Sequence, residues 1–293
     1  MKPTSFIYHT PNTIDEAAKL LASDPNDSKL LAGGQSLVPM LNLRVVRFGN
    51  LVDINRIPGL NHVRVEPASI VIGALARHYD VESSKEVGSA LPLLPAALAH
   101  VAHSQIRNRG TVVGSICHAD PAAEMPAVWL AVGGELTALS TTEIRTIRAE
   151  DFFISTYTTT LKPDEVVTEV RFNRTKANTG WSFDEVNMRH GNFALVGAVN
   201  LVTLDGGSVS DARLVSFGTG EKPIRIPAAE KRLIGTRASA VDDALLNAIA
   251  ADVSAAVDPT DDVHATIEYR RYVAGVLARR GLRQALERAQ SRA

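Results

Sequence analysis

The sequence predicts a mixed α+β protein of two parts, an N-terminal α/β region and a C-terminal α+β domain in which an antiparallel sheet is followed by helices. The 293 residues correspond to about two domains of typical size. Apolar residues make up 45% and charged residues 22%, as in ordinary globular chains. Strand and helix patterns mix up to a polar stretch at 175–180, whereas beyond it strands come first and helices afterwards.

The N-terminal region begins with a predicted helix and two strands. Thr13 and Glu16 form a capping box, and apolar residues then recur at helical spacing, which predicts a helix over 14–23. Short apolar runs at 30–32 and 51–54 are typical of buried strands. The first run leads directly into a glycine pair, so this loop follows the carboxyl end of a strand, where open sheets bind ligands.

The remaining elements follow from apolar runs, helical spacing and turn residues. Up to the polar stretch we expect strands at 69–74, 135–139 and 166–172 and helices at 91–103 and 122–132. Beyond it we expect strands at 195–204 and 209–217, joined by the hairpin turn Asp205-Gly206-Gly207, and helices at 239–257 and 266–289. These patterns divide the chain into residues 1–57, 58–177 and 178–293.

Composition excludes several classes of protein. The formal net charge is −1, so we expect no binding to nucleic acid or to an anionic membrane. Cys117 is the single cysteine, which excludes intramolecular disulfides and any iron-sulfur cluster held by this chain alone. No apolar run reaches the about 20 residues that a membrane span needs, so we expect a cytoplasmic protein. The motifs of P-loop enzymes, zinc proteases and Rossmann folds are missing from the sequence.

The strongest local signal is the segment Ala32-Gly33-Gly34-Gln35-Ser36. Adjacent glycines after a buried strand let the backbone turn sharply and bring its N–H groups close to a phosphate. The hydroxyl of Ser36 adds a further donor. An ordinary glycine turn has the same composition, so this segment by itself leaves both interpretations open.

A second glycine-bearing segment covers residues 107–115. It ends in Gly114 and Ser115 and is followed by Asp120 and Pro121, which are typical of the N-cap and first position of a helix. A structural role alone could therefore explain Asp120. Two such loops, one in each half of an α/β region, nevertheless indicate that both loops bind a single diphosphate, one from each side.

A zinc site is a weaker hypothesis. Cys117, His118 and Asp120 are close in sequence, and His100 and His103 are one helical turn apart. Their spacing fits no standard zinc signature, and isolated histidines usually have structural partners.

Two further groupings carry no strong prediction. Asp120 and Glu124 could form an acid/base pair, but no nucleophile accompanies them. The arginines of the last helix are typical of its solvated face. We therefore predict no catalytic residue and no metal ligand in this chain.

Taken together, the two loops resemble a known family. Residues 32–39 and 109–126 are similar to the FAD-binding medium subunit of molybdenum hydroxylases, the group of xanthine dehydrogenase, carbon monoxide dehydrogenase and the bacterial dehydrogenases of N-heteroaromatic compounds. The resemblance extends over essentially the whole chain. It implies two FAD-binding subdomains of the vanillyl-alcohol-oxidase (PCMH) type and a C-terminal α+β domain.

The resemblance also implies which residues bind FAD. The two loops would hold the diphosphate, Glu124 the adenosine ribose, Val167 would lie near the adenine, and Phe193 would lie beside the isoalloxazine ring. The implied FAD-binding residues are Ala32, Gly33, Gly34, Gln35, Ser36, Leu37, Thr111, Val113, Gly114, Ser115, Asp120, Glu124, Val167 and Phe193. For Phe193 the apolar pattern alone instead favours a buried residue at the start of a strand.

Two departures from the family pattern affect these assignments. Val113 stands where the family usually has glycine, so it must present its N–H without the conformational freedom of glycine. Xanthine dehydrogenases have a flavin-contacting lysine where this chain has Asp184 or Glu185, so no flavin contact is carried over there.

The implied function is electron transfer within an oxidoreductase complex. In this family a large molybdopterin-binding subunit hydroxylates the substrate, and electrons pass through two [2Fe-2S] clusters on a small subunit to the FAD of the medium subunit. We therefore expect an FAD subunit of a heteromeric molybdenum hydroxylase, assembled as a dimer of heterotrimers. The alternatives are a stand-alone FAD-dependent oxidase of the same fold and a non-redox scaffold subunit.

Overall fold

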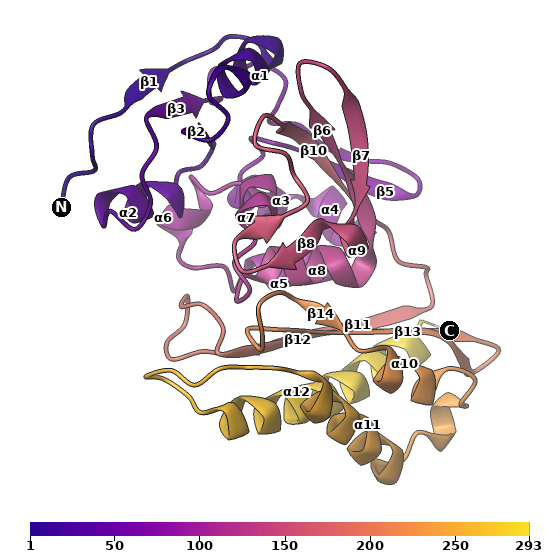
Figure 1. Cartoon of the computed structure of the whole chain (residues 1–293). Coiled ribbons are helices and arrows are strands. Elements are labelled where there is room, and N and C mark those ends of the chain that lie inside the picture. The colour runs from indigo at the N-terminus through magenta and orange to yellow at the C-terminus, as the bar shows by residue number, and fades with distance from the viewer. Residues whose placement is uncertain (293) are drawn as a thin grey trace.

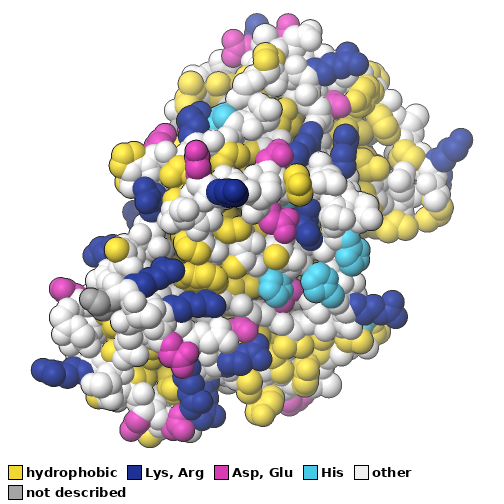
Figure 2. All heavy atoms as spheres, turned by 180° about the vertical axis from the view of Figure 1, so that it is seen from behind, with side chains coloured by type: hydrophobic (Ala, Val, Ile, Leu, Met, Phe, Trp, Pro, Cys, Tyr) yellow, Lys and Arg dark blue, Asp and Glu magenta, His cyan; other side chains and the backbone are white. Residues whose placement is uncertain are grey.

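The computed structural model describes residues 1–292 as two units. In Figure 1 the N-terminal unit, which ends with β10 (Val166–Asn173), lies above the C-terminal unit, which begins with β11 (Thr179–Val186). On the face seen in Figure 2, basic and acidic side chains are interspersed over both units rather than gathered into one field. No helix among these residues is both long and apolar enough to cross a membrane.

The first sheet is small and parallel. Its strand order is β1-β3-β2, and with two helices it consists of β1 (Ile7–His9), α1 (Ile14–Ser23), β2 (Ser28–Leu31), α2 (Leu37–Asn42) and β3 (Asn50–Asp53). The structure confirms half of the predicted capping box. The side chain of Thr13 accepts from the N–H of Glu16 at 3.2 Å, but the carboxylate of Glu16 accepts from the N–H of Asn12 at 2.7 Å instead of that of Thr13. Ala17, Ala18 and Leu21 form the buried face of α1. This arrangement places the glycine pair at the carboxyl end of β2.

The second sheet is antiparallel, with the order β4-β5-β10-β6-β7. Besides β10, its strands are β4 (Val63–Val65), β5 (Ser69–Gly73), β6 (Gly134–Leu139) and β7 (Ile144–Arg148). The helices of this region are α3 (His78–Ser83), α4 (Lys85–Ala90), α5 (Leu93–Leu98), α6 (Ser104–Arg107), α7 (Val112–His118), α8 (Glu124–Val132) and α9 (Ala149–Phe152). A two-stranded ribbon completes it, formed by β8 (Phe153–Ser155) and β9 (Thr158–Thr159).

The predicted helix over 91–103 is wrong, because the chain turns before its end. Helix α5 ends at Leu98, Ala102 has a left-handed φ of 43°, and His103 precedes α6. The guanidinium of Arg107 donates to the carbonyl of Ala102 at 3.2 Å and to that of Val101 at 3.0 Å. A side chain from the next helix thus satisfies carbonyls that the turn leaves free, an effect that apolar periodicity does not detect.

The C-terminal unit has one sheet and a layer of helices. The sheet order is β11-β12-β13-β14, formed with β12 (Val196–Asp205), β13 (Ser208–Phe217) and β14 (Ile224–Arg225). The helices α10 (Pro227–Leu233), α11 (Asp243–Ala256) and α12 (Ile267–Gln290), with a 3-10 turn at Ala238–Ala240, lie on one face of it, below the strands in Figure 1. The hairpin turn is confirmed, since Gly206 and Gly207 have φ of 54° and 79°.

Gly180 shows why the expected polar linker is shorter than 175–180. Thr179 and Gly180 already belong to β11. An ideal Cβ on Gly180 would lie 1.8 Å from the carbonyl oxygen of Ala285, so the strand and α12 touch backbone to backbone at this point. Glycine here permits close packing of a helix on a sheet rather than flexibility.

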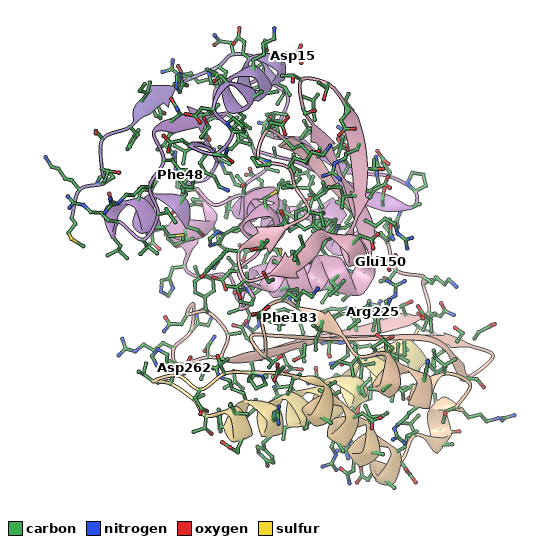
Figure 3. The ribbon with its side chains drawn as sticks, in the orientation of Figure 1. Asp15, Phe48, Glu150, Phe183, Arg225 and Asp262 are labelled. Carbon is green, nitrogen blue, oxygen red and sulfur yellow. The ribbon has the colours of Figure 1, made fainter. Side chains whose placement is uncertain are left out.

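The two units share a packed interface. All nine residues of α8 are buried, and the helix contacts β12 and β13 of the C-terminal sheet. Phe183, labelled at the boundary in Figure 3, lies 5.0 Å from the ring of His100 and 5.7 Å from that of Phe217. The N–H of Gly218 donates to the carbonyl of Pro121 at 2.8 Å. Apolar and backbone contacts together hold the units in one arrangement.

Candidate functional site

The two glycine-bearing segments meet at Gly33. An ideal Cβ on Gly33 would lie 2.5 Å from the carbonyl oxygen of Arg109 and 2.8 Å from the Cα of Gly110. Real Cβ atoms do not approach backbone atoms this closely, so only glycine allows the two segments to touch. The structure therefore brings together the two loops that the sequence predicted to form one site.

The first loop presents a row of free backbone donors. Within the described chain, no protein group accepts a hydrogen bond from the N–H groups of residues 33–36. Gly34 has a φ of 73°, and the amide of Gln35 donates to the carbonyl of Gly33 at 3.0 Å. Successive N–H groups in such a turn form a concave site that suits an anion.

The second loop is the start of a helix, which corrects the loop prediction for residues 111–115. Thr111 is the N-cap of α7, and its hydroxyl accepts from the N–H of Gly114 at 3.1 Å. Val113 has a helical conformation without positive φ, so it needs none of the freedom of glycine. The departure from the family pattern at Val113 therefore causes no backbone strain.

Asp120 is not the N-cap that the sequence predicted. Helix α8 begins at Glu124 with Ala123 as its N-cap. Instead, the carboxylate of Asp120 accepts from the N–H of Ala122 at 2.9 Å and from the hydroxyl of Tyr157 at 3.1 Å. Burial, and next the charge of Asp120, raise the pKa of Tyr157 to about 12, so its hydroxyl stays protonated and keeps donating.

Glu124 carries a buried carboxyl group close to the carboxylate of Asp120. The residue is only 4% exposed to solvent. Burial is the main cause that raises its pKa to about 8, and the nearby carboxylates of Glu185 and Asp120 act in the same direction. A protonated carboxyl can donate one hydrogen bond as well as accept, a combination suited to a sugar hydroxyl.

This pKa predicts a pH dependence of folding in the FAD-free chain. The folded state keeps the proton of Glu124 where an unfolded chain has already lost it, so stability falls as pH rises between 4.5 and about 8. With about 1.4 kcal/mol per unit of pKa shift, we expect a fall on the order of 5 kcal/mol. Denaturant titrations at both ends of this window measure it.

Glu124→Gln should remove that part of the fall and leave the chain more stable at the alkaline end. Glu135→Gln is the matched control, because the Glu135 side chain is 45% exposed. Equal pH slopes in the parent and in Glu124→Gln would contradict the buried, protonated state of Glu124.

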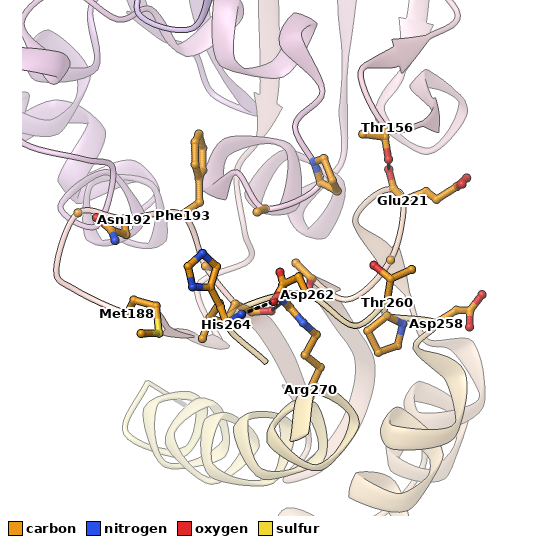
Figure 4. A pocket seen from close by; sticks show the side chains of 18 residues that line it. Thr156, Met188, Asn192, Phe193, Glu221, Asp258, Thr260, Asp262, His264 and Arg270 are labelled. Atoms are coloured by element: carbon orange, nitrogen blue, oxygen red, sulfur yellow. Dashed lines mark hydrogen bonds and ion pairs between the residues drawn. The ribbon is translucent and has the colours of Figure 1, made fainter. Parts of the chain in front are cut away.

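Val167 and Phe193 lie in different units of the molecule. Val167 is buried in β10, at an irregularity of the strand pairing. Phe193 is 57% exposed and lies before β12, which begins at Val196, so the prediction of a buried strand start is wrong. Its ring points from the C-terminal unit toward the N-terminal unit, on the wall of a cavity of about 710 Å³ (Figure 4).

The cavity lies between the two units. Pro121 and Thr156 come from the N-terminal unit, whereas Phe193, Asp262 and Arg270 come from the C-terminal unit. The guanidinium of Arg270 donates to Asp262 at 2.5 Å and to the carbonyls of residues 195 and 218 at 2.5 and 3.1 Å. Arg270 is therefore buried and structural, unlike the solvated arginine that the sequence predicted.

The zinc hypothesis finds no support in the part of the chain that the structure describes, where no cluster of His, Cys, Asp and Glu could hold a metal ion. His100 instead contacts Glu185, with 3.3 Å between Nδ1 and Oε1. The nearby Asp184 pairs with Arg280 at 2.5 Å. Cys117 is half-buried, and the burial of its thiol raises the pKa of that group to about 12.

Sequence reasoning missed Asn55 and Arg77. Both side chains hydrogen-bond to backbone carbonyls of the two glycine-bearing segments, at Ala32 and Arg109. A lone asparagine and a lone arginine outside any motif give no local signal, and only the folded chain brings them together.

Comparison with known families defines the class of this protein. Residues 4–173 match the FAD binding domain in molybdopterin dehydrogenase, and residues 181–285 match the CO dehydrogenase flavoprotein C-terminal domain. The chain therefore belongs to the family of FAD-binding subunits of the molybdenum hydroxylases, as its two loops suggested.

Several relatives are similar over nearly their whole length. The chain is 43% identical over 294 residues to the 6-hydroxypseudooxynicotine dehydrogenase complex subunit alpha of Paenarthrobacter nicotinovorans, with 99% of this chain and 97% of that protein covered. It is 35% identical over 288 residues to the carbon monoxide dehydrogenase medium chain of Hydrogenophaga pseudoflava, with 98% and 99% covered.

Solved structures give the same result. Carbon monoxide dehydrogenase from Hydrogenophaga pseudoflava matches with a TM-score of 0.94 and 36% identity, over 98% of this chain and 99% of that one. Quinoline 2-oxidoreductase from Pseudomonas putida 86 matches with a TM-score of 0.92 and 32% identity, over 99% of both chains. The predicted fold of an FAD-binding domain followed by a C-terminal α+β domain is confirmed.

Proposed function

We propose that this chain is the FAD-carrying, electron-transferring medium subunit of a heteromeric molybdenum hydroxylase. In this proposal it accepts electrons from [2Fe-2S] clusters on a small partner subunit and passes them to an external acceptor, while a large molybdopterin-binding subunit oxidises the substrate. The row of free N–H groups at 33–36, where the two glycine-bearing segments meet, carries the proposal. A diphosphate needs such a set of donors.

The residues at this junction fit FAD. Residues 32–37 and 111–115 would hold its diphosphate, and the buried carboxyl of Glu124 suits a ribose hydroxyl. Val167 supplies an apolar wall for the adenine, and the exposed ring of Phe193 is free to stack on the isoalloxazine. Bound FAD supplies the redox chemistry, so the task of the protein is to bind it, exclude water from one face and expose an edge to the electron donor.

The partner chains follow from what this chain lacks and from its relatives. A single cysteine cannot hold an iron-sulfur cluster, so the clusters belong to another subunit. One relative is named as part of a dehydrogenase complex and another as a medium chain. A dimer of heterotrimers in the cytoplasm is the assembly that we propose.

Redox titration of the purified chain tests the function. FAD should bind noncovalently, and dithionite should bleach its spectrum. Anaerobic mixing with heteroaromatic compounds or aldehydes should leave the oxidised spectrum unchanged, because the isolated chain lacks the molybdenum centre and the electron supply. Direct bleaching by such a compound would instead support a stand-alone oxidase, and failure to bind FAD would support a scaffold subunit.

Phe193→Ala tests the proposed ring contact. Because Phe193 is exposed, the substitution should cost far less than the about 3–5 kcal/mol of a core phenylalanine truncation. FAD should remain bound through the diphosphate loops, while its absorption spectrum shifts and its reoxidation by oxygen changes rate. Tyr272→Ala, which truncates another exposed aromatic side chain, is the control. A parental spectrum and reoxidation rate in Phe193→Ala would refute the contact.

A further inference from the structure

Asn55 and Arg77 form a bracket behind the junction of the two glycine-bearing segments. The amide Nδ2 of Asn55 donates to the carbonyl of Ala32 at 2.8 Å. Nη1 of Arg77 donates to the carbonyl of Arg109 at 2.6 Å. The two side chains also hold each other, because Nη2 of Arg77 donates to Oδ1 of Asn55 at 2.7 Å. One continuous chain of hydrogen bonds thus joins the first segment to the second.

The orientation of the Asn55 amide is fixed by its neighbours. Oδ1 of Asp53 accepts from the backbone N–H of Asn55 at 2.8 Å and from its Nδ2 at 2.6 Å. The nitrogen end therefore faces two acceptors, at Asp53 and Ala32, and the oxygen end faces the guanidinium of Arg77. A reversed amide would lose all three side-chain bonds, so this side chain is held as a connector between the segments.

The bracket acts on the same atoms at which the segments touch. The carbonyl oxygen of Arg109, which Arg77 holds, is the atom nearest to an ideal Cβ on Gly33. Ala32, whose carbonyl Asn55 holds, immediately precedes that glycine. Asn55 and Arg77 hold these two carbonyl groups by hydrogen bonds. The carbonyls are thereby kept from turning toward the free N–H groups of 33–36, which would bind a diphosphate.

We propose that Arg77 and Asn55 are positioning residues that set the spacing of the two diphosphate loops, so that FAD affinity depends on both side chains although neither is assigned a contact with FAD. This inference rests on the proposed placement of the site. A bidentate guanidinium is suited to the role, because one planar group bonds a carbonyl and an amide at once. The ammonium of a lysine is a single point and replaces this geometry only in part.

Equilibrium binding of FAD and of ADP to the full chain, freed of cofactor, tests the proposal. ADP contains the diphosphate and the ribose but no flavin ring, so it reports on the loops alone. Arg77→Met and Asn55→Ala should each weaken both ligands at least tenfold, which corresponds to about 1.4 kcal/mol. Arg77→Lys should lie between the parent and Arg77→Met. The double variant should be hardly weaker than the poorer single variant, because the two side chains act as one unit.

Arg174→Met is the matched control. Arg174 also donates to two backbone carbonyls in the same unit, those of Glu66 and Pro67 at 3.2 and 3.1 Å, but outside the two loops. The melting temperatures of the FAD-free variants show how much stability each substitution costs, and only Arg77→Met should lose ligand affinity.

Two results separate failure of the bracket from failure of the site. Unchanged FAD and ADP affinity in Arg77→Met, with Gly33→Ala impaired, overturns the bracket and keeps the site. Unchanged affinity in Gly33→Ala overturns the placement of the site itself. If Arg77→Met does not fold, parental affinity in both Arg77→Lys and Asn55→Ala overturns the bracket, and additive losses in the double variant overturn the coupling.

Discussion

Gly33→Ala is expected to weaken FAD binding by about a hundredfold, which corresponds to about 2.8 kcal/mol. The new methyl group would lie 2.5 Å from the carbonyl oxygen of Arg109 and 2.8 Å from the Cα of Gly110, so the two loops must move apart. Overpacking of this kind costs about 1–3 kcal/mol. We expect this displacement to weaken the affinity for FAD, which equilibrium titration measures.

Gly88→Ala is the control for this result. Gly88 lies in α4, and an ideal Cβ there has Pro95 as its nearest neighbour at 4.0 Å. The control should bind FAD like the parent and gain slightly in stability, since alanine favours a helix. A yellow Gly33→Ala protein with full occupancy at micromolar FAD would contradict the contact between the loops.

The largest loss of folding stability is expected for Gly180→Ala. An ideal Cβ would lie 1.8 Å from the carbonyl oxygen of Ala285 and 2.5 Å from the backbone nitrogen of Ala289, so α12 must lift away from β11. We expect a loss of about 3 kcal/mol or more, above the usual range for overpacking, because rigid backbone rather than a flexible side chain is displaced. The midpoint of denaturant unfolding measures this loss.

Gly220→Ala is the matched control within the same unit. Its ideal Cβ has an ordinary 3.5 Å contact with the carbonyl of Asp258, and its φ is not positive. The hydrophobic cluster that includes α12 draws its residues from the C-terminal unit alone, so the two glycine-bearing segments of Gly180→Ala should keep their arrangement. An unfolding midpoint in Gly180→Ala equal to that of the control would show that the helix and the strand do not pack so closely.

Long periodic elements could be predicted from the sequence, and short ones could not. The hairpin of β12 and β13 follows from its apolar strands and glycine turn, and α1 follows from its N-cap Thr13 and the helical spacing of its apolar residues. Helix α7 has seven residues, too few for a periodic pattern, so its first turn resembled a glycine loop. The break at Ala102 depends on Arg107, whose side chain satisfies the freed carbonyls from outside the apolar pattern.

The candidate site divides in the same way. Gly33 and Gly34 are visible in the sequence because a glycine pair after a strand is a local feature. Glycine is required at position 33 because the backbone there touches Arg109, which is distant in the chain. The hydrogen bond between Asn55 and Arg77 also joins residues that are distant in the chain. The burial that raises the pKa of Glu124 likewise arises only in the folded protein. Local patterns thus indicated the proposed diphosphate loop, whereas its supports required the tertiary structure.

The junction at Gly33 has a consequence for how the protein is made on the ribosome. A nascent chain presents the first glycine segment long before Arg109 has been added, so the early polypeptide contains only half of the proposed cofactor site. The central strand β10 lies between β5 and β6, and therefore the second sheet closes only after residue 173 has emerged. Segments that lie far apart in the chain must all be synthesised before the site can form. We therefore expect FAD to bind late, after the N-terminal half has folded, and not to guide that folding.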